Sequence, residues 1–192
     1  MRYLISLLLV ALLILMFSFR GKKNDITVGQ DVVTTTNFTE EKPIEKNNIE
    51  YVGTTIQPSE FVNYAKTLIG TPYLYGSVDP QKGLDCSGFI NAVSNHFGIK
   101  VPRSSVEFTN FGKTIETGNA APGDLILFTG TDTSKRVVGH IGIVTDNTNG
   151  QIQFIHSSSG KAMGVTISDM AGYYETRFVK IVRILPADKI VA

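Results

Sequence analysis

Beyond residue 57, the hydrophobic pattern of the chain changes at Pro122-Gly123-Asp124, and this change restricts the folds that this part of the chain can adopt. Before this turn, apolar residues recur at the spacing of a helix, whereas after it short segments rich in β-branched residues follow one another. We expect helices over residues 58–70, 85–98 and 104–111, and strands over residues 125–129, 137–145, 152–156 and 177–185. Helices followed by strands joined through short turns are the order of an α+β domain with an antiparallel sheet.

The composition excludes two broad classes of protein. The chain has 192 residues, of which 42% are hydrophobic, so it can bury a core and is neither disordered nor fibrous. Its formal net charge of +1 gives too weak a field for a protein that works by neutralising phosphates. We therefore expect no nucleic acid among its partners.

The chain begins with an apolar segment. Residues 3–19 are almost all aliphatic or aromatic, so residues 1–20 are predicted to be a signal peptide or an N-terminal membrane anchor. Arg20, Lys22 and Lys23 follow this segment. Counting positive charges alone would place the rest of the chain in the cytoplasm.

A polar stretch separates the apolar segment from the region with helical periodicity. Residues 21–57 are rich in Thr, Asn, Glu and Lys and lack a clear period, which favours a flexible linker. The alternative is that residues 31–33 and 49–52 are short strands packed on the domain. We assign residues 58–192 to one globular domain.

Cys86 is the only cysteine of the chain, so it forms neither an intramolecular disulfide nor a multi-cysteine metal site. It is either a small buried residue or a nucleophile. The second helix is predicted to begin at Asp85 or Cys86, where free backbone N–H groups and the helix dipole lower the pKa of a thiol. Its neighbours Ser87 and Gly88 are small or polar, whereas a structural cysteine is expected within the apolar stripe.

A nucleophilic cysteine needs a base, and the chain has three histidines. His96 follows Cys86 on the same helix about 15 Å further along the axis, so it is excluded as the base. His140 and His156 lie on two strands that are predicted hairpin neighbours, and Gly142 would let a helix backbone approach the face that carries His140. A helix laid on that face would bring Cys86 to both imidazoles, with His140 as general base and His156 orienting its ring.

Two other interpretations of these residues stay open. Each histidine alone is compatible with a half-buried residue whose ring is satisfied by backbone carbonyls. A zinc site would use the same residue types, but Cys86, His140 and His156 lack a close pair of ligands at the usual spacing. We expect no metal and no cofactor.

Several short segments together resemble the NlpC family of bacterial cell-wall cysteine peptidases, in order and spacing, over about residues 57–185. These segments are Gly70-Thr71-Pro72-Tyr73, Gly76, Leu84-Asp85-Cys86-Ser87-Gly88-Phe89, Val101-Pro102-Arg103-Ser104-Ser105, Pro122-Gly123-Asp124-Leu125, Gly139-His140-Ile141-Gly142-Ile143 and Ile155-His156. The resemblance implies a papain-like α+β fold in which N-terminal helices, with the catalytic cysteine at a helix start, pack on an antiparallel β-sheet. It also implies hydrolysis of peptide bonds in the peptidoglycan stem, often the bond between D-γ-glutamate and a diamino acid.

By the same resemblance, Cys86 is the nucleophile, His140 the base and His156 the third catalytic residue. The residues that the resemblance assigns to substrate binding are Tyr73, Asp85, Ser87, Arg103 and Ser105, with Tyr73 near the oxyanion. Tyr73 is also compatible with a turn aromatic packed on the core, and Asp85 with a plain helix N-cap.

The chain departs from the family in two respects. Phe108 stands where relatives commonly have Gln, which removes one polar contact to substrate or loop. Residues 21–57 are too short and too polar for an SH3-like binding domain, so we expect targeting to come from the N-terminal segment or from the cleft.

Our hypothesis is a secreted or membrane-associated cysteine peptidase whose partners are peptidoglycan stem peptides and, if residues 3–19 are retained, the membrane. Because peptidoglycan lies outside the cytoplasm, we place the domain outside as well, against the charge count. Two alternatives are an amidase or acyltransferase on the same scaffold and a non-catalytic cell-wall binding module.

Overall fold

The computed structural model describes residues 56–132 and 134–185. The predicted signal or anchor segment and nearly all of the predicted linker lie outside the described residues, so both assignments stay predictions. Within the described residues, no helix is both long enough and apolar enough to cross a membrane.

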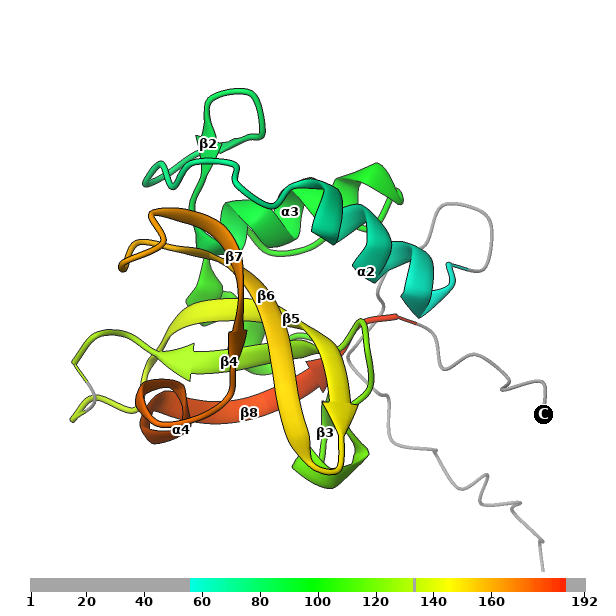
Figure 1. The fold of residues 1–192 in the computed structure, drawn as a ribbon, viewed down its shortest axis with the longest axis vertical. Helices are drawn as coiled ribbons and strands as arrows, with labels where there is room; N and C mark the ends of the chain where they lie inside the picture. Colours follow the sequence, from blue (N-terminus) through cyan, green and yellow to red (C-terminus); the bar gives the residue numbers. More distant parts are fainter. Residues whose placement is uncertain (1–55, 133, 186–192) are drawn as a thin grey trace, which may run out of the picture. The chain divides into compact units, whose positions relative to one another are not determined.

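The described residues form helices first and a β-sheet second, as the periodicity predicts (Figure 1). The helical elements are α2 (Pro58–Thr67), α3 (Cys86–His96), the 3₁₀ turns η1 (Ser105–Asn110) and η2 (Thr117–Asn119), and α4 (Tyr173–Arg177). The strands are β1 (Val78–Asp79), β2 (Gly83–Leu84), β3 (Lys113–Ile115), β4 (Leu125–Thr129), β5 (Val138–Thr148), β6 (Gln151–Ser158), β7 (Gly164–Asp169) and β8 (Phe178–Arg183).

The main sheet has six strands in the order β3-β8-β4-β5-β6-β7, and all its pairings are antiparallel. Strands β1 and β2 form a separate two-stranded ribbon just before α3. Helices α2 and α3 lie together over one face of the sheet, and α4 lies beyond the other (Figure 1). The α+β class expected from the sequence is therefore confirmed.

Both faces of the central strands are buried, which gives the sheet two hydrophobic layers. Leu127, Ile141 and Ile155 belong to the layer that includes the buried residues of α2 and α3. Phe128 and Phe154 belong to a second cluster on the opposite face. Strand β4 is buried along its whole length, as expected for a central strand covered on both sides.

The Pro122-Gly123-Asp124 turn is anchored by a buried ion pair. Asp124 is 2% exposed and accepts two bonds from Arg183, from Nε at 2.6 Å and from Nη2 at 2.8 Å. Gly123 has φ 92°, a left-handed conformation in which a side chain would be strained. These residues fix the entry into β4, so their part in the motif is structural.

The expected helices and strands are present, but several elements were not predicted. The third helix is the 3₁₀ turn η1, and β5 extends to Thr148. Strand β3, helix α4 and the strands of the β1–β2 ribbon are too short to show a period, and β7 alternates between apolar and polar residues but was still not predicted. Strands β3 and β7 are edge strands, and α4 is a single short turn of helix, so tertiary pairing decides their conformation.

Two single-residue expectations also have clear outcomes. His96 is exposed and stacks on Tyr64 with ring centroids 3.6 Å apart, in agreement with a residue at the solvent edge of its helix. Phe108 is fully buried in the core beside Phe111. The position at which the family commonly has a polar Gln is therefore a packing position in this chain.

Candidate active site

Cys86 is the first residue of α3, and Asp85 caps this helix. The Asp85 Oδ1 atom accepts the backbone N–H of Gly88 at 2.6 Å, which satisfies one of the free donors of the first turn. A Cβ on Gly88 would lie 2.0 Å from the carbonyl oxygen of Ser77, so only glycine lets the preceding loop pack on this turn. The local sequence thus fixes Cys86 at the end of a rigid helix.

Asp85 also ties the helix start to a distant loop. Arg103 donates to both carboxylate oxygens, from Nη2 at 2.7 Å and from Nη1 at 3.1 Å, and its Nη1 atom donates to Ser87 Oγ at 2.9 Å. Burial alone would raise the pKa of Asp85, but the bonds from Arg103 and from backbone N–H groups outweigh it and lower the pKa. Asp85 is therefore a helix N-cap, which is one of the two roles considered from the sequence, and it also forms an ion pair with Arg103.

A hollow of about 440 Å³ collects all the residues predicted to bind substrate. We call it the Arg103 hollow. Its predicted substrate-binding residues, which line it beside Cys86, are Tyr73, Asp85, Ser87, Arg103 and Ser105. Arg103 is 44% exposed at its side chain, whereas Asp85 is 10% exposed, so the cation and not the carboxylate faces this space.

A second hollow of about 240 Å³ joins the cysteine to the first histidine, and we call it the His140 hollow. Cys86, Tyr73 and His140 all line it. Cys86 is partly exposed and borders both hollows, so its sulfur is not sealed within the core.

The two imidazoles do not lie on the helix-covered face, and that expectation is wrong. Alternation along β5 places Ile141 under the helices and His140 on the other face, opposite Phe128 of β4. Gly142 accommodates β6 instead of a helix, because its Cβ would lie 2.7 Å from a ring atom of Phe154. Cys86 instead meets β5 from the helix end, where the backbone N–H of Ile141 acts to lower the pKa of the thiol.

A chain of hydrogen bonds runs inward from His140. Its Nε2 atom lies 2.8 Å from Nδ1 of His156, and Nε2 of His156 lies 3.0 Å from Ser168 Oγ. The hydroxyl of Tyr174 lies 3.4 Å from the same nitrogen. Ser168 on β7 and Tyr174 on α4 were not identified from the sequence, because neither element was predicted.

The surroundings of both rings favour their neutral forms. Burial lowers the pKa of His140 well below its ordinary value, and the neighbouring His156 and Arg177 lower it further. Burial and the charge of Arg177 bring the pKa of His156 to about 4. At neutral pH both imidazoles are therefore uncharged, and His140 can accept a proton.

The thiol does not have the lowered pKa expected from its place at the helix start. Burial raises the pKa of Cys86 above its ordinary value, and the negative charge of Asp85 adds to this. Backbone N–H groups of Ser87, Cys86 and Ile141 act in the opposite direction but do not prevail. With no substrate bound, the pair is therefore a neutral thiol and a neutral imidazole, not a thiolate and an imidazolium.

Tyr73 keeps its proton in this site. Burial raises the pKa of its hydroxyl, and the negative charge of Asp85 raises it further, against a hydrogen bond with Ser159. A protonated phenol is a hydrogen-bond donor, and Tyr73 lines both hollows that Cys86 borders.

Comparison of the sequence with known proteins identifies relatives of this chain. The NlpC/P60 family model matches residues 70–183. A murein DD-endopeptidase and murein LD-carboxypeptidase of Escherichia coli, MepS, is 36% identical over 118 residues, which cover 60% of this chain and 57% of the relative. A gamma-DL-glutamyl hydrolase of Bacillus subtilis is 33% identical over 124 residues, which cover 64% of this chain and 28% of the relative.

Solved structures share the fold. An NlpC/P60 family protein of Bacillus cereus superposes with a TM-score of 0.62 at 27% identity, over 69% of this chain and 42% of that one. The NlpC/p60 domain of the peptidoglycan hydrolase SagA superposes with a TM-score of 0.56 at 25% identity, over 67% of this chain and the whole of that one, 100%. The papain-like α+β fold expected from the sequence is confirmed by these neighbours.

Proposed function

Because the chain belongs to the NlpC/P60 family, we propose that it is a peptidoglycan hydrolase, a cysteine endopeptidase that cleaves a peptide bond in the stem. The bond between D-γ-glutamate and the diamino acid is the proposed site of cleavage. One observation carries the proposal: Cys86 shares a hollow with His140, and the ring of His140 is hydrogen bonded to His156.

The proton of the thiol moves as the substrate reacts. Cys86 is neutral and His140 is a neutral base, so the sulfur attacks the scissile carbonyl while His140 takes the thiol proton. His140 then gives this proton to the departing amine, and a thioester remains on Cys86. Water, deprotonated by His140, hydrolyses the thioester and releases the new carboxyl group.

The hydrogen-bond chain selects the tautomer that this reaction needs. The Nε2 atom of His140 faces His156, so Nδ1 is the atom left to accept the proton and Nε2 must carry hydrogen. His156 then accepts at Nδ1 and donates from Nε2 to Ser168 Oγ. His156 is thereby the orienting third residue, and Ser168 is a positioning residue behind it.

Tyr73 is the proposed side-chain donor to the oxyanion. Its hydroxyl is protonated and lines the same hollows as Cys86, so it can donate to the oxygen of the tetrahedral intermediate. Asp85 binds Arg103 and the helix start, so its role in substrate binding is to hold Arg103 and Ser87 in the cleft.

The proposed substrate fixes the proposed location. Peptidoglycan lies outside the cytoplasm, and the relatives named above include murein and peptidoglycan hydrolases. We therefore place the domain outside the cytoplasm, and residues 1–20 would direct it there as a signal peptide or hold it there as a membrane anchor.

Mass spectrometry of soluble muropeptides tests the reaction. Incubation with the purified full-length chain should release fragments with a free D-glutamate γ-carboxyl group and a new amino terminus on the diamino acid. The Cys86→Ser variant, matched in concentration and fold, should release none.

The products also separate the alternatives. Loss of the stem at the sugar would identify an amidase, and transfer to an added amine would identify an acyltransferase. Binding without any new product, equal for the original chain and Cys86→Ser, would leave only a cell-wall binding module.

A further inference from the structure

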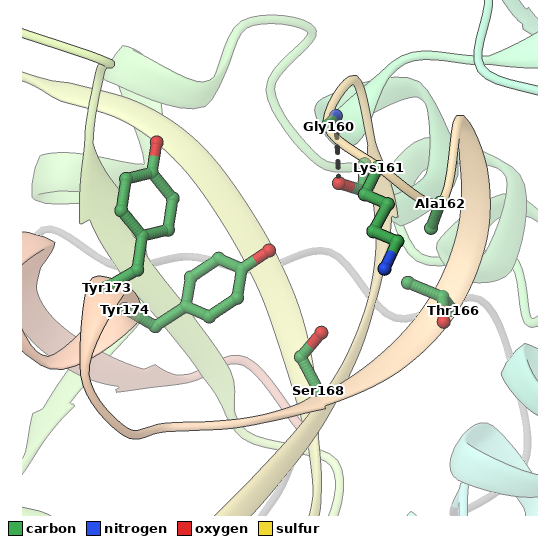
Figure 2. Close-up of a pocket in the computed structure, with 8 residues that line it drawn as sticks. Gly160, Lys161, Ala162, Thr166, Ser168, Tyr173 and Tyr174 are labelled. Carbon is green, nitrogen blue, oxygen red and sulfur yellow. Dashed lines mark hydrogen bonds between the residues drawn. The ribbon is translucent and has the colours of Figure 1, made fainter.

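A third hollow, of about 560 Å³, opens between the β6–β7 turn and helix α4 (Figure 2). Lys161 enters it from the turn, Ser168 lines it from β7, and Tyr174 borders it from α4. In Figure 2 the ammonium group of Lys161 and the hydroxyls of Ser168 and Tyr174 face the gap between these elements. We call this space the Lys161 hollow.

The Lys161 hollow continues the cleft that holds Cys86. It shares lining residues with the His140 hollow, namely Ser158, Gly160, Tyr173 and Tyr174. The Arg103 hollow adjoins the His140 hollow through other residues, namely Tyr73, Cys86 and Gly139. A peptide held at Cys86 can therefore extend from the Arg103 hollow on one side to the Lys161 hollow on the other.

The part of the cleft beyond His140 carries positive charge without a matching acid. Lys161 lines the Lys161 hollow and Arg177 lines the His140 hollow, and no Asp or Glu lines either one. Among the ion pairs between described residues, none includes Lys161 or Arg177. Lys161 is exposed and can thus bind a negative group in this part of the cleft directly, whereas the buried Arg177 can act on such a group through its charge.

The charge of Arg177 is buried without a carboxylate beside it in the described part of the chain. Its residue is 5% exposed, yet its charge is met only by the carbonyl oxygen of Thr129, at 2.6 Å from Nη2, and by the ring of Tyr173, 4.7 Å away. Its Nε atom is buried and has no hydrogen-bond partner. A buried cation without a carboxylate is unfavourable, and an anion that enters the adjoining hollow relieves part of that cost.

The Arg103 hollow offers no equivalent site. Arg103 is already bonded to both carboxylate oxygens of Asp85, so a substrate carboxylate would have to compete with a preformed ion pair. The two sides of Cys86 therefore differ in charge although both are lined by an arginine.

We propose that the Lys161 hollow is a subsite for a carboxylate of the stem peptide, with the ammonium group of Lys161 as its direct partner. Arg177, which lines the adjoining His140 hollow, adds to the positive potential at this subsite. The inference rests on the proposed function and extends it from the reacting bond to substrate selection. Stem peptides carry such groups on both sides of the proposed bond, at the α-carbon of D-glutamate and on the diamino acid. An amidated stem, which lacks the charge, should bind less well.

Binding measured without turnover tests the subsite. The full-length Cys86→Ser chain should be titrated with L-alanyl-γ-D-glutamyl-diaminopimelyl-D-alanine, with the peptide amidated at D-glutamate, and with the peptide amidated on the side chain of the diamino acid. We expect one of the amidated forms to bind about fivefold more weakly at low salt, and that form identifies the carboxylate concerned.

A matched pair of lysine variants tests whether the preference for the carboxylate depends on Lys161. Lys161→Gln in the Cys86→Ser background should weaken binding of the unamidated peptide by the same factor. It should leave the affinity for the more weakly bound amidated peptide unchanged. Lys113→Gln removes another exposed lysine, from β3 at the opposite edge of the sheet, and should keep the full preference. Raising the salt concentration should reduce the preference of the Lys113→Gln chain but not of the Lys161→Gln chain.

The outcomes separate this inference from the proposed function. Equal affinity for all three peptides, or equal behaviour of the two lysine variants, overturns the subsite even if the original chain cleaves muropeptides. A carboxylate preference that depends on Lys161, in a chain that cleaves nothing, supports the subsite and refutes the hydrolase. No binding of any peptide contradicts both.

Discussion

Cys86 and His140 line one hollow, yet they lie in very different surroundings. Cys86 is partly exposed at a helix start, and the groups that act to lower the pKa of its thiol are backbone N–H groups. His140 stands on a sheet face among aromatic rings, with His156 and then Ser168 behind it. The nucleophile is held by local chain geometry, whereas the base is held by side chains from three strands.

This difference explains why the resting site is uncharged. Burial acts on both groups, so it raises the pKa of the thiol and lowers the pKa of the imidazoles. A helix start alone would favour the thiolate, but Asp85, which caps that same helix, contributes a negative charge beside the sulfur. Asp85 thus caps the helix and at the same time opposes the lowering of the thiol pKa by the helix start.

Removing the nucleophile at the helix start should produce the largest effect. We expect Cys86→Ser to lower kcat/KM for muropeptide cleavage by about a thousandfold or more, because a serine hydroxyl is a far weaker nucleophile beside the same base. The melting temperature should change little, since serine has nearly the shape of cysteine and the residue is only partly buried. Cleavage at the original rate by a folded Cys86→Ser chain would refute the assignment.

Acid should destabilise the histidine end. The pKa of His156 is about 4 in the folded chain and about 6.5 when unfolded, so between these values the unfolded state binds the extra proton. Stability is complete above pH 6.5 and falls as the pH approaches 4, by on the order of 3 kcal/mol, or roughly a hundredfold in the folding equilibrium.

Denaturant titrations at several pH values measure this loss. His156→Gln should reduce the loss, while His96→Gln, which changes an exposed histidine on α3, should leave it in place. Equal acid sensitivity of the two variants would show that His156 is not held neutral by its surroundings.

Removing the charge of Asp85 tests how much its ion pair with Arg103 stabilises the start of α3. Asp85→Asn keeps a capping oxygen but leaves Arg103 without its carboxylate, so we expect a loss of about 2 kcal/mol in the free energy of unfolding. Asp79→Asn, at an exposed ion pair in the neighbouring ribbon, is the matched control and should change little. Equal losses would mean that the Asp85–Arg103 pair adds nothing beyond an exposed pair.

Removing Ser168, behind the two histidines, should have the smallest effect. Ser168→Ala deletes the acceptor behind His156, so the Nε2–H tautomer loses its preference and kcat should fall about fivefold with KM unchanged. Thr166→Val is the control, because this hydroxyl lies on the same strand and hollow without a bond to the ring.

Nitrogen-15 shifts of His156 report the tautomer directly. They should show hydrogen on Nε2 in the original chain and in Thr166→Val, and a mixed population in Ser168→Ala. A fall in kcat without a change of tautomer would assign Ser168 a merely structural role.

The helix and strand pattern could be predicted over most of the domain, because α2, α3, β4, β5 and β6 have one or two strongly apolar faces. Elements that are short or lie at an edge of the sheet were missed. Among them are β7 and α4, which supply Ser168 and Tyr174, so the inner end of the hydrogen-bond chain could not be predicted.

Two features of the site could be predicted from the sequence, namely that Cys86 opens a helix capped by Asp85 and that His140 and His156 lie on paired strands, because capping and alternation are local properties of the chain. Three further features required the folded domain: the imidazoles lie on the face away from the helices, the thiol stays neutral, and Arg177 has no acid beside it among the described residues. These depend on burial and on charges brought together from distant segments, and no local pattern records either one.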